Sequence, residues 1–171
     1  DDYPQDDQIE TRVGPRMSVL DIVLWPDACL STQCVPVDII TPDLEQLIAD
    51  MFDTMYAAQG RGLAAPQVGR TERIFVFDAT WKSGVPSPVA CVNPEILGLS
   101  ETRVLGEEAC LSIPGVPISI CRASEVTLRW ADTQGIRTKS FDSAEAVIIQ
   151  HENDHLDGIV IYDRQVKERM E

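Results

Sequence analysis

The spacing of apolar residues predicts a helix early in the chain. After Thr41, apolar side chains recur every three or four positions, which places them on one face of a helix. Thr41 can cap its start, Pro42 suits the first turn, and acidic residues follow where the helix dipole is positive. We expect Gly60 to end it. The face expected to pack against the core consists of Leu44, Leu47, Ile48, Met51 and Met55.

Short stretches rich in β-branched and aromatic residues predict strands in the middle of the chain. Ile74-Phe-Val-Phe77 is apolar throughout and should be buried, whereas the glycines and proline between residues 60 and 67 predict a loop. A hairpin turn at 132–135 should lead to a return strand through Phe141. The other strands are expected at residues 89–92, 96–99, 116–120, 126–130 and 159–162.

A second helix is expected near the carboxyl end. It should begin at Asp142, where Glu145 follows three residues later as in a capping box, and should stop at Gly158. Several strands with two helices predict an α+β fold, with antiparallel strands packed around this C-terminal helix. Residues 1–16 are polar and acidic without periodicity, which predicts a flexible extension ahead of a single domain at 17–171.

Composition narrows the function classes. Asp and Glu total 28 against 14 Lys and Arg, a net charge of −14, which argues against tight binding to nucleic acid phosphates. No apolar run is long enough to cross a bilayer, so we expect no membrane partner. The five cysteines are an odd number and form no CxxC pair, which indicates a reducing compartment.

The segment His151-Glu-Asn-Asp-His155 contains both histidines of the chain. On a helix, residues four apart share a face, so both imidazoles can reach one metal ion. Glu152, just after the first histidine, can hold or move a proton at a water on that metal. The same pattern also fits a polar helix face in solvent.

Two histidines leave a metal site incomplete, because catalytic sites commonly use three protein ligands and a water. The metzincin pattern would need a histidine at position 161, which is Ile161. A distant glutamate or a thiolate remains, and Cys110 is the best thiolate candidate. The alternative for Cys110 is an inert buried side chain.

Three segments together resemble the peptide deformylase family. The family is marked by GxGxAAPQ, EGCLS and QHExDHLxG, in this order. The chain has GRGLAAPQ at 60–67, EACLS at 108–112 and QHENDHLDG at 150–158, and the resemblance covers roughly Ser18 to Arg164. It implies an enzyme that removes the formyl group from the N-terminal formylmethionine of new polypeptides and releases formate.

The resemblance also implies the roles of individual residues. Cys110, His151 and His155 would bind one divalent metal ion, with iron favoured in the cell and zinc, nickel or cobalt as replacements. Glu152 would take up the proton of the attacking water. The oxyanion would receive hydrogen bonds from the side-chain amide of Gln67 and the backbone N–H of residue 111, which is Leu111.

N-formylmethionyl peptides are therefore the expected substrates. Gly60 and Gly62 would let the peptide backbone approach as an added strand. Val147 and Ile148 either line a pocket for the methionine side chain or only pack in the core.

Two positions depart from the family pattern. Ala109 replaces the usual glycine before the cysteine and would be strained if this position needs a positive φ. Arg61 stands where an aliphatic residue is common, and is either a solvated side chain or one that favours an acidic group on the peptide. These departures keep an alternative open, a deformylase-like hydrolase or binder with a different N-acyl or peptide ligand.

The cellular setting is less constrained. The resemblance favours a bacterial-type cytoplasm, while a mitochondrial or plastid location stays open because a removed transit peptide leaves no trace. The chain stops at Glu171, without the longer C-terminal helix by which some family members contact the ribosome, so ribosome contact and oligomeric state are left open.

Overall fold

The computed structural model describes residues 18–166, and the expectation of a flexible extension at 1–16 lies outside this range. The fold is α+β with antiparallel sheets, as the sequence predicts. One sheet has the strand order β1-β2-β3-β6-β7, and the other is the hairpin β4-β5. The strands are β1 (Gly62–Ala64), β2 (Ile74–Phe77), β3 (Val89–Leu99), β4 (Arg103–Cys110), β5 (Ile113–Ala123), β6 (Glu125–Asp132) and β7 (Gly135–Asp142).

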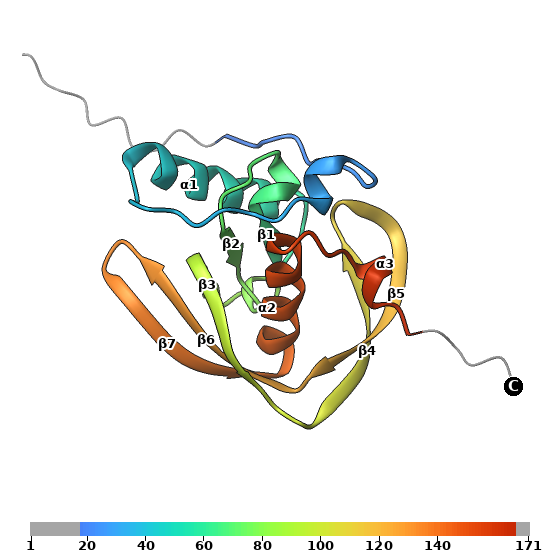
Figure 1. Ribbon diagram of the computed structural model, residues 1–171. Coiled ribbons are helices and arrows are strands. Elements are labelled where there is room, and N and C mark those ends of the chain that lie inside the picture. Colours follow the sequence, from blue (N-terminus) through green and yellow to red (C-terminus); the bar gives the residue numbers. More distant parts are fainter. Residues whose placement is uncertain (1–17, 167–171) are drawn as a thin grey trace, which may run out of the picture.

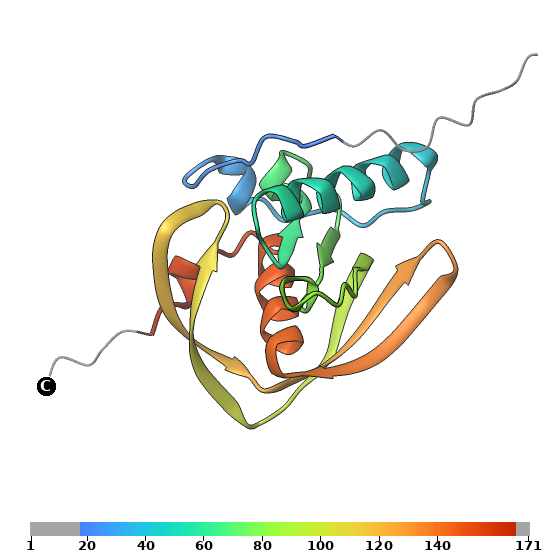
Figure 2. The ribbon, with the colours of Figure 1, turned by 180° about the vertical axis from the view of Figure 1, so that it is seen from behind.

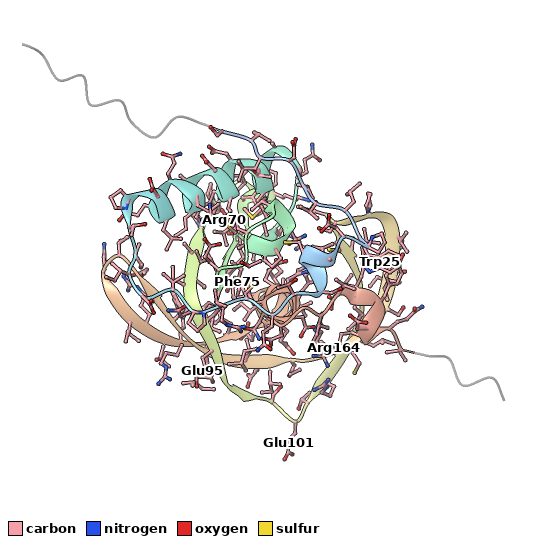
Figure 3. All side chains as sticks on the ribbon, turned by 45° about the horizontal axis from the view of Figure 1, so that its top comes forward. Trp25, Arg70, Phe75, Glu95, Glu101 and Arg164 are labelled. Carbon is pink, nitrogen blue, oxygen red and sulfur yellow. The ribbon has the colours of Figure 1, made fainter. Side chains whose placement is uncertain are left out.

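Three α-helices and three 3-10 turns accompany the strands in the described range. The helices are α1 (Pro42–Ala57), α2 (Ser143–Leu156) and α3 (Ile161–Arg164), and the turns are η1 (Ala28–Ser31), η2 (Ala65–Val68) and η3 (Trp81–Ser83). The helix α2 runs between the two sheets and contacts strands of both, while α1 crosses one end of the molecule (Figures 1 and 2). Phe75 of β2 lies fully buried inside (Figure 3).

The first predicted helix is confirmed, with a different end. Thr41 accepts a hydrogen bond from the Leu44 N–H at 3.2 Å, and the expected apolar face is buried apart from a half-buried Ile48. The helix ends at Ala57, and Gln59 rather than Gly60 takes the left-handed conformation, with φ of 58°. The Gly60 N–H then bonds the Met55 carbonyl at 2.9 Å, which closes the helix end.

The second predicted helix also begins where expected, after Asp142. The Asp142 side chain makes no capping hydrogen bond, so the predicted capping box is absent. Eight residues of α2 are buried, because a helix enclosed by two sheets has little exposed face. They include the polar side chains of Gln150, His151, Glu152, Asp154 and His155.

Several strand predictions need correction. The two stretches expected at 89–92 and 96–99 form one strand, β3, whose register shifts twice opposite β6. Asn93 absorbs the irregularity with φ of 49°, and its side chain bonds the Val37 N–H and carbonyl at 2.7 Å each. The strands at 74–77, 116–120 and 126–130 and the turn at 132–135 are confirmed within β2, β5, β6 and the β6–β7 hairpin.

The sequence prediction was wrong for two segments and missed one strand. The segment 60–67, expected to be a loop, contains β1 and most of η2, and the segment before Cys110 forms the unpredicted strand β4. The closing strand expected at 159–162 is absent: residues 159–160 are irregular, and α3 begins at Ile161. There the Asp163 carboxylate accepts a hydrogen bond from the Val160 N–H at 2.9 Å, which favours a helical turn.

None of the described helices is long and apolar enough to cross a membrane. The described cysteines form no disulfide. Cys34, Cys91 and Cys110 are buried, Cys29 is half-buried and Cys121 is exposed.

Gly158 fixes how the chain leaves α2. Its φ is +74°, and a Cβ there would lie 2.8 Å from the backbone carbonyl carbon and oxygen of Ser31. We expect Gly158→Ala to lower the free energy of unfolding by roughly 2 kcal/mol or more, since strain and a backbone clash combine. Chemical denaturation at matched metal content measures this. Gly98→Ala, where a Cβ meets open space, is the control and should stay near the wild-type value.

Candidate metal centre and peptide pocket

The structure brings together the three residues that the sequence singled out as metal ligands. Cys110 is the last residue of β4, and His151 and His155 lie one turn apart on α2. Their ligand atoms all lie within 4.8 Å of one another, and the Cys110 Sγ is 3.4 Å from the His155 Nε2. Ligands about 2.0–2.3 Å from a tetrahedral metal are separated by roughly 3.3–3.8 Å, so the cluster fits one ion.

His151 is oriented by a buried chain of charges. Its Nδ1 lies 2.8 Å from the Glu108 carboxylate, which leaves Nε2 to face the cluster. Glu108 in turn accepts two hydrogen bonds from Arg122, at 2.8 and 2.9 Å. Arg122 also donates to Asp154 at 2.6 Å, and Asp154 receives two further bonds from Arg164.

This network keeps Glu108 charged despite its burial. Burial alone would raise the pKa of Glu108, but hydrogen bonds from Arg122 and His151 outweigh it and lower the pKa to about 2. The folded pKa therefore lies below the ordinary value of 4.5. The ionised Glu108 therefore stabilises the folded protein fully above about pH 4.5, and this stabilisation is lost as the pH falls towards 2.

Glu152 has the surroundings of a proton acceptor. Its side chain is buried, its Oε2 has no hydrogen-bond partner, and its Oε1 lies 3.7 Å from the His151 Nε2. Burial disfavours the charged carboxylate, which raises the pKa of Glu152 to about 7 even though His151 opposes the shift. A carboxyl group with this pKa can take up and release a proton near neutral pH.

Gln67 is held with its amide nitrogen towards the cluster. Its Oε1 accepts the Ala64 N–H at 3.0 Å, and its Nε2 donates to the Ser112 Oγ at 3.1 Å and lies 3.6 Å from the Cys110 Sγ. Leu111 begins the two-residue turn between β4 and β5, so its N–H lies outside the paired strands. Both donors predicted from the sequence therefore lie beside Cys110.

Gly60 and Gly62 leave room for two site residues. A Cβ on Gly62 would lie 2.9 Å from the Glu152 Cγ and Oε1, and one on Gly60 would lie 2.7 Å from the Leu111 Cδ1. The glycines thus permit a close approach to Glu152 and Leu111, a reason that the sequence did not reveal.

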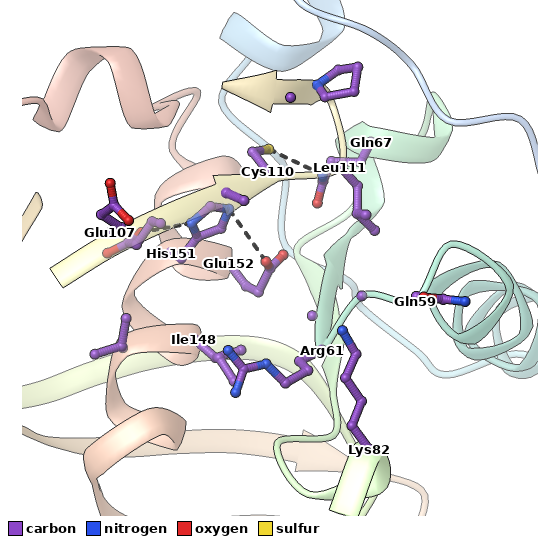
Figure 4. A pocket seen from close by; sticks show the side chains of 17 residues that line it. Gln59, Arg61, Gln67, Lys82, Glu107, Cys110, Leu111, Ile148, His151 and Glu152 are labelled. Carbon is purple, nitrogen blue, oxygen red and sulfur yellow. Dashed lines mark hydrogen bonds and ion pairs between the residues drawn. The ribbon is translucent and has the colours of Figure 1, made fainter. Parts of the chain in front are cut away.

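Cys110 and His151 of the cluster line a pocket of about 390 Å³, within the usual range for ligand sites (Figure 4). Half-buried Val147 and Ile148 line it, and Ile148 also packs against the core. Ala109 lines the pocket as part of β4 and has no positive φ, so the strain considered for this departure is absent.

The comparisons with known proteins agree with this geometry. The family model described as polypeptide deformylase matches residues 19–171. A peptide deformylase from Hydrogenovibrio crunogenus (strain DSM 25203 / XCL-2) is 44% identical over 149 residues, which cover 86% of each chain. The chain belongs to the polypeptide deformylase family. Relatives of this name are metal-dependent hydrolases, so the predicted enzyme class is confirmed.

Solved deformylases share the fold. The crystal structure of peptide deformylase from Thermotoga maritima has a TM-score of 0.82 at 35% identity and covers 87% of this chain and 99% of that one. A Met-Ala-Ser-bound class I type b deformylase from Acinetobacter baumannii has a TM-score of 0.80 at 33% identity, with the same coverage. The α+β prediction is thereby confirmed against solved family members.

Arg122 and the role of Asp154 escaped the sequence analysis. Arg122 lies 14 residues after Glu108 and 32 before Asp154, so no local spacing links the three. Asp154 falls inside the HENDH segment, and its position beside a ligand was the one available signal.

Removing the charge of Glu108 tests the network. Glu108→Gln leaves Arg122 without one buried partner, and we expect the free energy of unfolding to fall by about 3 kcal/mol. It also weakens the orientation of His151, so metal affinity should drop about 10- to 100-fold. Denaturation and competition with a chelator measure the two effects.

Glu95→Gln is the matched control, because its pair with Arg129 is half exposed on both sides. It should change stability by less than about 0.5 kcal/mol and leave metal affinity unchanged. Equal effects of the two substitutions would contradict the special role of the buried pair.

Proposed function

We propose that this deformylase family member removes the N-formyl group from the N-terminal formylmethionine of newly made polypeptides and releases formate. The cluster of Cys110, His151 and His155, with Glu152 beside it at a peptide-sized pocket, is the observation that carries the proposal. Family membership supports the reaction type, and the site residues found by sequence lie together in space.

One divalent metal ion would be held by the Cys110 sulfur and the two histidine nitrogens. When bound, such an ion supplies the Lewis acidity that lowers the pKa of a water molecule to near neutrality. The mixed thiolate and imidazole ligands suit Fe(II) as well as Zn(II), and we infer Fe(II) in the cell, with Zn(II), Ni(II) or Co(II) as replacements.

Glu152 moves the proton. Its carboxylate accepts the proton of the water that attacks the formyl carbon, and then delivers it to the amine that leaves when the C–N bond breaks. The pKa of about 7 permits both steps. The unpartnered Oε2 is the atom available for this transfer.

Gln67 and Leu111 stabilise the charge that develops on the formyl oxygen. The Gln67 Nε2 and the Leu111 N–H are fixed donors beside Cys110, so they need little rearrangement during the reaction. Removing one such donor typically lowers the rate roughly 100- to 1000-fold.

The peptide binds as an added strand along β1. This strand pairs only with β2 and forms the edge of its sheet, so its free side can receive an extended chain next to Gly60 and Gly62. Val147 and Ile148 would line the pocket for the methionine side chain.

The substrates would be nascent chains in a bacterial-type cytoplasm. The odd number of cysteines and the lack of a CxxC pair favour a reducing compartment. The acidic chain is poorly suited to phosphate-rich partners such as ribosomal RNA.

Loss of the thiolate tests the ligand set. Cys110→Ser replaces a soft thiolate by a hydroxyl, so we expect loss of stoichiometric Fe(II) or Zn(II) in purified protein, measured by metal analysis. Cys121→Ser changes an exposed cysteine outside the site and should keep full metal content. Stoichiometric, tightly held metal in the Cys110 variant would contradict the proposed site.

Glu152→Ala separates proton transfer from metal binding. The anaerobic Fe(II) form of the native protein should release formate from formyl-Met-Ala-Ser, and the variant should keep its metal but lose most of kcat. Glu145→Ala, in the first turn of the same helix, is the control and should stay active.

An unchanged kcat in Glu152→Ala would rule out the proton-transfer role. Absence of formate release by the native Fe(II) protein would overturn the function. Hydrolysis of acetyl-Met-Ala-Ser in its place would then favour a different N-acyl substrate.

A further inference from the structure

Arginine side chains in the described part of the chain have partners with one exception. Between residues 18 and 166 there are eight arginines, and the Arg61 guanidinium alone makes no hydrogen bond or ion pair with another described residue. The arginines with partners are Arg70, Arg73, Arg103, Arg122, Arg129, Arg137 and Arg164. In a chain with twice as many acidic as basic residues, an unpaired arginine is free for a ligand.

Arg61 lies in the peptide pocket and is exposed. Its side chain extends from the segment before β1 towards Ile148, across the side of the pocket below Glu152 (Figure 4). Asp78, whose N–H bonds the Arg61 carbonyl, forms no ion pair with the Arg61 guanidinium; its carboxylate instead accepts hydrogen bonds from Tyr56, Thr80 and Ser87.

A second cation is fixed beside it. Lys82 lines the same pocket and lies on the same side as Arg61 (Figure 4). The preceding residue, Trp81, donates its indole N–H to the Gly60 carbonyl at 2.9 Å, which ties η3 to the segment that carries Arg61. The Lys82 ammonium also lies 5.6 Å from the Trp81 ring, within cation–π range.

The pocket therefore has positive charge at one end and negative charge at the other. Arg61 and Lys82 flank the open side of β1, whereas exposed Glu107 lies at the opposite end, on β4 (Figure 4). A peptide that extends along β1 passes the two cations as it leaves the pocket, so its side chains after the methionine come within reach of them.

We propose that Arg61 and Lys82 select formylmethionyl peptides with an acidic side chain at one of the two positions after the methionine. This inference rests on the proposed deformylase function and names its preferred substrate class. The net charge of −14 repels acidic peptides at long range, and two unpaired cations at the exit offset this where the peptide binds.

Matched peptides test the preference. The metal-loaded protein is assayed for formate release with formyl-Met-Asp-Ser, formyl-Met-Asn-Ser and formyl-Met-Lys-Ser. A second set of peptides carries the aspartate, asparagine or lysine at the third position instead of the second. We expect kcat/KM for the aspartate peptide to exceed that of its asparagine isostere roughly two- to fivefold at low salt, as for exposed ion pairs. The ratio should shrink as ionic strength rises.

Variants assign the preference to the two cations. Arg61→Gln combined with Lys82→Gln should bring the aspartate-to-asparagine ratio of kcat/KM close to one. Arg61→Glu should make the lysine peptide a better substrate than the aspartate peptide. Arg61→Lys keeps the charge and should retain most of the ratio. Arg129→Gln removes an exposed arginine that is paired with Glu95, and should leave the ratio unchanged.

The failures are distinguishable. Formate release from all peptides at equal rates, or a preference that survives the double variant, overturns this inference and leaves the deformylase function intact. A preference for lysine in the native protein also overturns it and points to Glu107. No formate from any formyl peptide overturns the function, and the inference falls with it.

Discussion

The buried side chain of Arg122 connects the parts that must meet at the metal centre. It reaches from β5 to Glu108 on β4 and to Asp154 on α2, and Arg164 of α3 shares the second partner. Cys110 follows Glu108 by two residues, and Asp154 lies between the two histidines. The ion pairs thus set the position of the hairpin that carries the sulfur relative to the helix that carries the nitrogens.

Each charge in this network has a partner, because burying an unpaired charge is destabilising. An unpaired charge in this interior would be destabilising by several kcal/mol, and replacing the whole set by apolar residues could be neutral for stability. Apolar side chains, however, would give up the hydrogen bond that orients His151. The network is therefore better explained by the geometry it imposes on the ligands than by its contribution to stability.

Sequence patterns revealed the site better than the fold. The HENDH spacing alone pointed to His151, Glu152 and His155, whereas the roles of Cys110 and Gln67 came from the resemblance to the deformylase family. α1 and β2 were equally readable because their apolar spacing is regular. β4 escaped because its exposed and glycine-containing sequence has no clear alternation, and α3 was mistaken for a strand because Ile159 to Tyr162 is apolar whichever structure it adopts. Arg122 escaped because its contacts are set by tertiary packing.

The shortness of β1 has a consequence for the range of proteins this enzyme can serve. Three residues of edge strand offer few backbone hydrogen bonds, and backbone groups are the same in every polypeptide. In the proposed binding mode, recognition through these backbone groups would not depend on the downstream side chains, which would be distinguished only by Arg61 and Lys82. An edge this brief also gives a second copy of the protein little to pair with, so the enzyme exposes a free strand edge with little risk of aggregation.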